Sequence, residues 1–100
     1  MEQPLRTPRT LAQIQGIINS ARDSVWVITD EIEKLTAGAA LPNENNKGNI
    51  DRNVEHLKLI VADKEIVNSG EDIADLIAAI ATGEAKLAEN IWPAAADDTE

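Results

Sequence analysis

The apolar residues of the N-terminal third recur at alternating steps of three and four residues, a spacing that a helix uses and a strand does not. A strand would need alternation by two, and the residues flanking the run SVWVIT do not alternate. The pattern therefore predicts a long amphipathic helix with Trp26 near its middle. Its apolar edge, here called the seam, comprises Leu11, Ile14, Ile18, Ala21, Val25, Ile28, Ile32 and Leu35.

Capping signals place the start of this helix near residue 8. Thr7 followed by Pro8 offers an N-cap with proline at the first helical position, and Thr10 with Gln13 forms a second, capping-box candidate. Gly38 and the polar run that follows it end the helix. A helix over about residues 8–38 would be roughly 45 Å long at ~1.5 Å per residue. That length is large for a chain of 100 residues.

Two shorter helices are expected after a polar loop. Asn49 is the predicted N-cap of a helix over about residues 50–68, whose apolar stripe comprises Ile50, Val54, Leu57 and Val61. Within it, Asp63 is a candidate to cap a short turn, and Gly70 is expected to close that turn in the left-handed conformation.

A further capping box, Ser69 with Asp72, predicts the last helix over about residues 70–91. Gly83 inside that helix marks a kink, a close helix contact or a break. Together these segments predict an all-α helical hairpin or bundle. It forms one domain over residues 8–92, between a flexible arm (1–7) and an acidic disordered tail (93–100).

The core of this bundle is expected to be thin. Phe, Tyr and Cys are absent, so aliphatic side chains and alanine must fill it. A chain of this size hides roughly 60–70% of its unfolded surface on folding. A second copy would add buried area that one chain lacks, so we expect the seam to pair with copies of itself in a homo-oligomer.

Catalytic and metal-binding patterns were not found in the sequence. His56 is the only histidine and there is no cysteine, so one chain cannot assemble a His/Cys zinc site. Acidic residues are plentiful, but no Glu-x-x-His motif accompanies them, and no phosphate-binding glycine pattern or G-x-S-x-G elbow occurs. We therefore expect a protein that is not an enzyme and uses no cofactor or metal.

The net charge of −9 argues against direct binding to a phosphate backbone. Arg6 and Arg9 lie ahead of the first helix, but no basic helix face supports them. Two interpretations of the acidic residues stay open: a solvated surface that aids solubility, or a face that engages a basic partner. No apolar run approaches the ~20 residues of a membrane span, and no secretory signal is evident, which predicts a cytoplasmic protein.

Two tryptophans are the candidates for a partner interface. If the seam faces inward, Trp26 and Val27 lie on another flank of the same helix. Either a later helix of the same chain covers that flank, or another subunit or target protein does. Trp92 is expected to dock on the bundle and hold the end of the last helix; alternatively, it belongs to a short recognition peptide.

Turn and cap residues of the C-terminal half form a further pattern. It comprises His56-Leu57, Ala62-Asp63-Lys64-Glu65-Ile66, Ser69-Gly70 and Ala81-Thr82-Gly83-Glu84-Ala85. The pattern resembles small uncharacterised helical proteins encoded by tailed phages and prophages. The resemblance implies a phage origin and either a virion-associated or a host-directed accessory role, in the bacterial cytoplasm or the virion, with no active site to carry over.

The sequence thus favours a non-enzymatic oligomerisation or interaction protein with a structural or scaffolding role. Its expected partners are copies of itself and a host or virion protein. The alternative is an acidic inhibitor that blocks a basic site on a host protein, as a nucleic-acid mimic would. A ligand pocket between subunits is a third possibility that a single sequence does not test.

Overall fold

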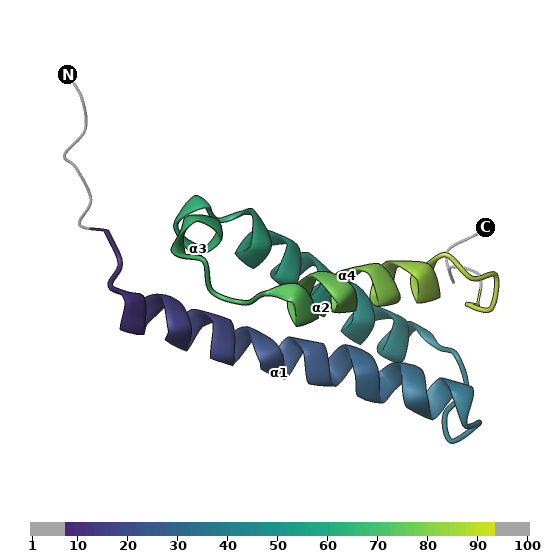
Figure 1. The fold of residues 1–100 in the computed structure, drawn as a ribbon. Helices are drawn as coiled ribbons and strands as arrows, with labels where there is room; N and C mark the ends of the chain where they lie inside the picture. The colour runs from purple at the N-terminus through teal and green to yellow at the C-terminus, as the bar shows by residue number, and fades with distance from the viewer. Residues whose placement is uncertain (1–7, 94–100) are drawn as a thin grey trace.

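A computed structural model describes residues 8–93, and about three-quarters of these lie in four helices (Figure 1). The helices are α1 (Leu11–Thr36), α2 (Glu44–Ala62), α3 (Lys64–Ser69) and α4 (Ala74–Leu87). The described residues contain no strand, which confirms the all-α prediction. The arm at 1–7 and all but the first residue of the tail at 93–100 lie outside the described residues.

Helix α1 contains the run SVWVIT, as the heptad spacing predicts. It begins after Thr10, whose Oγ1 accepts a hydrogen bond from the Gln13 backbone nitrogen (3.1 Å) while the Gln13 side chain accepts one from Thr10 N (2.8 Å). The second capping candidate is therefore the one used. Gly38, with φ of 76°, ends the helix in the left-handed conformation.

Helix α2 begins six residues earlier than the sequence indicated, so the prediction of Asn49 as its N-cap was wrong. Asn43 caps the helix, and its side chain and that of Asn46 bond each other's backbone nitrogens at 2.8 and 3.0 Å. Asn46 is buried and also donates to the Leu41 carbonyl at 2.8 Å. Polar residues that resemble a loop thus form the first helical turns, because their amides satisfy the helix end.

The segment expected as one helix over 50–68 is divided at Asp63. Its side chain accepts hydrogen bonds from the backbone nitrogens of Glu65 and Ile66 and so caps α3. Gly70, with φ of 78°, ends α3 in the left-handed conformation. Both expectations, the recapping at Asp63 and the glycine stop, are confirmed.

The expected capping box of the last helix was wrong. Ser69 Oγ donates to the Ile66 carbonyl and accepts from Glu71 N, so it belongs to the end of α3. Ile73 occupies the N-cap position of α4 without a side-chain cap. The helix ends at Leu87 rather than near residue 91.

The helices pack in two thin layers. Helices α1 and α2 run in opposite directions side by side, and α4 lies against both and runs in the direction of α1 (Figure 1). The described molecule measures 51 × 33 × 16 Å. Its core draws on all four helices and comprises Ile14, Ile18, Ala21, Ile28, Ile50, Val54, Leu57, Ile66, Leu76 and Ala79.

Gly83 lets α4 approach the other two helices closely. A Cβ atom at this position would overlap the Val54 Cγ2 methyl and would lie 3.4 Å from Ile28 and 3.5 Å from Ile50. Of the three roles considered for this glycine, the close helix contact is the one observed. Gly16 differs, because a Cβ there would meet no atom within 4 Å.

We expect Gly83→Ala to lower the free energy of unfolding by about 1–2 kcal/mol, because overpacking at Val54 outweighs the better helix propensity of alanine. The matched control is Gly16→Ala, which should raise it by up to about 1 kcal/mol. Urea unfolding followed by circular dichroism measures both changes. A Gly83→Ala protein as stable as the Gly16→Ala protein would contradict the close packing of α4.

Candidate protein-interaction surface

The seam of α1 is packed within the chain. Ile14, Ile18, Ala21 and Ile28 are buried in the core, and Val25, Ile32 and Leu35 are half-buried against it. Leu11 alone of the eight is exposed, at 53%. The seam that we expected to pair between copies therefore packs against helices of its own chain, and contact with a second copy requires another surface.

The two tryptophans are placed differently. Trp92 packs partly buried against the core, and its indole nitrogen donates to the Lys86 carbonyl at 3.2 Å, so it docks on the end of α4. Trp26 is 66% exposed, and Val27 beside it is half-buried. Packing within the described chain thus leaves most of the Trp26 side chain uncovered.

Polar contacts between α1 and α4 locate Trp26 on the molecule. Arg22 Nε bonds Asp75 Oδ2 at 2.8 Å, and one turn further along each helix lie Trp26 and Ala79. Because residues four apart share a helix face, Trp26 lies on the side of α1 that borders α4. It is level with the middle of α4.

The outer side of α4 is a row of exposed alanines. Their spacing of four, three, four and three residues keeps them on one side of the helix, and they are Ala74, Ala78, Ala81, Ala85 and Ala88. Ile77, 52% exposed, flanks the row on the α2 side, because Glu84, two turns further along α4, bonds Lys58 of α2 at 2.7 Å. We call the alanine row with Ile77 and Trp26 the α4 face.

The sequence contained the signal for this face without revealing its role. The sequence of the last helix is rich in alanine. The heptad spacing of its alanines was also present, but periodicity does not say which side of a helix faces outward. The structure resolves this point, because the opposite side of α4 carries the buried residues Leu76, Ala79 and Gly83.

The acidic side chains are distributed over all four helices. Seven of them make ion pairs with Arg9, Arg22, Lys34, Lys58 or Lys86. Hydrogen bonding to Arg22 lowers the pKa of Asp75, and hydrogen bonding to Arg9 lowers that of Asp63. The residues of the α4 face are uncharged, and the exposed side chains of Asp75 and Glu84 border the face on its two flanks.

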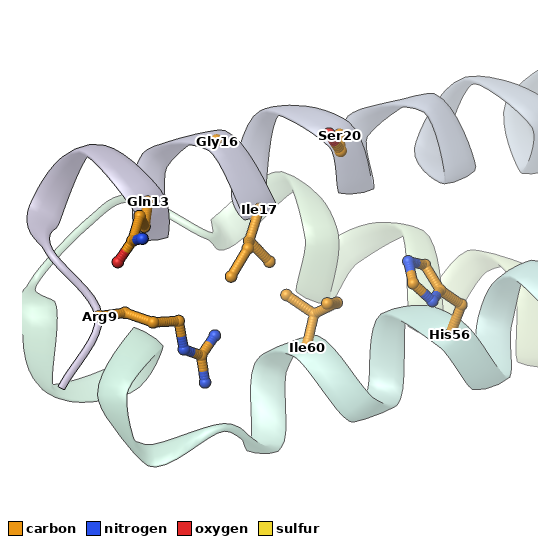
Figure 2. A pocket seen from close by; sticks show the side chains of 7 residues that line it. All are labelled: Arg9, Gln13, Gly16, Ile17, Ser20, His56 and Ile60. Carbon is orange, nitrogen blue, oxygen red and sulfur yellow. The ribbon is translucent and has the colours of Figure 1, made fainter. Parts of the chain in front are cut away.

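A groove of about 640 Å³ separates α1 from α2 at the end near Arg9. Ile17 and Ile60 point toward each other at its centre, and Ser20 and His56 lie at the far end (Figure 2). His56 is exposed. Among residues 8–93, no three His, Cys, Asp or Glu side chains are grouped as metal ligands. The groove therefore offers apolar contact at its centre and polar groups around it, from Arg9, Gln13, Ser20 and His56.

Comparison with known proteins gives no relative to guide the assignment. No family model, no curated protein and no solved structure matches this chain. Within the described part of the chain, no helix is long and apolar enough to cross a membrane. The α4 face is therefore the best-defined candidate surface, on geometry alone.

The pair of Arg9 and Asp63 joins the start of α1 to α3 and should make stability depend on pH. Asp63 has a lowered pKa in the folded chain, so its contribution is present above the unfolded pKa of about 3.9 and is lost as pH falls through the folded pKa. Asp63→Asn keeps a cap acceptor and removes the charge. We expect it to be less stable than wild type at neutral pH, with the difference shrinking below about pH 4.

Urea unfolding at several pH values measures this difference. The control is Asp51→Asn, on an exposed position of α2 that makes no ion pair within residues 8–93. If the free energy of unfolding of Asp63→Asn stays below that of wild type by the same amount from neutral to acid pH, the proposed role of the charge is contradicted.

Proposed function

We propose that this protein is a non-enzymatic helical interaction protein that assembles with copies of itself and serves a structural or scaffolding role. The observation that carries the proposal is the α4 face, where Trp26 stands exposed beside an uncharged row of alanines. Tryptophan is enriched among the residues that dominate binding energy at interfaces. A large apolar side chain bordering a flat apolar surface is typical of such sites.

The small core supports the same proposal. Ten hydrophobic residues are buried, whereas seven large ones stay exposed in the described chain. Small domains bury a low share of their surface, so covering an apolar face with a second molecule adds stability that one chain does not have. Self-association supplies that cover without any other component.

The resemblance of residues 54–88 to small phage-encoded helical proteins gives this proposal a setting. A protein of that kind would contribute to a phage particle or to its assembly, within the bacterial host cytoplasm or the virion. A self-associating helical unit suits such a role, because particles are built from repeated copies.

The alternative is an acidic inhibitor that occupies a basic site on a host protein. The net charge of −9 favours it, since opposite charge steers association. A nucleic-acid mimic would use a continuous acidic face. Here half of the acidic side chains of residues 8–93 are held in ion pairs, and the others are divided among α1, α2 and the segment before α4, which gives this alternative less support.

Sedimentation of the purified chain over a range of concentrations tests the proposal. We expect a dimer or larger assembly at micromolar concentration, and Trp26→Ala should weaken it roughly ten- to a hundredfold because it removes about 1–3 kcal/mol of apolar contact. The control is Leu59→Ala, which truncates a side chain 73% exposed on the outer side of α2. A wild-type chain that is monomeric up to ~100 µM would contradict the proposal, since it would place the Kd above that range.

A further inference from the structure

The α4 face has a large apolar side chain on each side of the alanine row. Trp26 lies on the α1 side, level with Ala78 and Ala79, and Ile77 lies on the α2 side. The two side chains therefore stand at nearly the same height along α4, on opposite flanks. This arrangement is self-complementary under one kind of two-fold symmetry.

A two-fold axis parallel to α4 would bring opposite flanks of two copies together. Each Trp26 would then lie against Ile77 of the second copy, and both contacts would form at once because the heights match. Between them the two alanine rows would meet. Alanine side chains allow helix axes to approach to about 8 Å, the short end of the usual range.

The other two-fold arrangement, with the two α4 helices antiparallel, brings like flanks together. Trp26 would face Trp26, and the outer edge of α1, which carries Asp23 and Glu33, would face the same edge of the second copy. Like charges placed opposite each other oppose association. In the parallel arrangement, the α1 edge instead faces the α2 edge, which carries charges of both signs because Lys58 is paired there with Glu55 and Glu84.

The length of α4 and the width of the molecule limit the area of this surface. Helix α4 has 14 residues and is therefore about 21 Å long. The product of this length and the 33 Å extent of the molecule, roughly 700 Å², is the upper limit for a footprint that includes both flanks. A stable interface buries about 800 Å² on each partner, so a dimer through this surface must use the flanks of α1 and α2 as well as the alanine row.

We propose that the occupant of the α4 face is a second copy of this chain, with the two α4 helices parallel and in register and with each Trp26 packed against Ile77 of the other copy. This inference rests on the proposed self-association and specifies its geometry. Covering the face in this way buries Trp26, Ile77 and the alanine row, and the Arg22–Asp75 and Lys58–Glu84 ion pairs lie at its edges.

Cysteine cross-linking tests the geometry, because the native chain has no cysteine. Ala78→Cys and Ala85→Cys are prepared separately, with Leu59→Cys as the control on the outer side of α2. In a parallel, in-register pair, a residue of the alanine row meets the same residue of the second copy, within the Cα separation of about 4.4–6.8 Å that a disulfide needs. Each alanine-row variant alone should form a disulfide-linked dimer in mild oxidant, and Leu59→Cys should not.

Other results overturn this geometry. Linkage that appears only when Ala78→Cys and Ala85→Cys are mixed would show an antiparallel pair, and linkage only at Leu59→Cys would show a different interface. In either case self-association measured by sedimentation would still stand. A monomeric wild type without linkage at any site would overturn both the geometry and the proposed function. Circular dichroism of each variant confirms that its helices are intact.

Discussion

The contact of Gly83 with Val54 is the constraint on which the arrangement of the helices depends. It sets how deeply α4 sits between α1 and α2, because any side chain at residue 83 would occupy the space of the Val54 methyl. Residues of α4 that share this side, Leu76 and Ala79, are then buried. A single small residue thus sets how closely the inner side of α4 approaches α2.

Once the inner side of α4 is fixed, its outer side follows. Ion pairs on both flanks of α4 favour the same orientation of the helix about its own axis. Asp75 is joined to Arg22 of α1, and Glu84 is joined to Lys58 of α2. Exposed pairs of this kind contribute little stability, typically under about 1 kcal/mol. Their value here is in orientation, because they keep the alanine row turned away from the core.

The sequence predicted the helices better than it predicted what covers them. The heptad spacing identified α1, and local chemistry indicated the recapping at Asp63 and the stop at Gly70, but it offered Thr10 only as the second of two candidate caps. The sequence did not identify the N-cap of α2, because Asn43 and Asn49 are both good cap residues. Only the packing of Asn46 in the folded chain selects Asn43. The spacing of the seam also showed which side of α1 is apolar. Periodicity alone does not say whether a second copy or a later helix of the same chain covers that side.

Charge separates the two proposed functions. Pairing two copies brings two net charges of −9 together, so their repulsion opposes self-association and added salt screens it. Binding to a basic site on another protein responds in the opposite way, because salt weakens that attraction. If the α4 face serves self-association, the sedimenting species should hold together at least as well at about 0.5 M salt as at low salt. An assembly that dissociates as salt rises would argue that charge attraction, rather than apolar contact at Trp26, holds the partner.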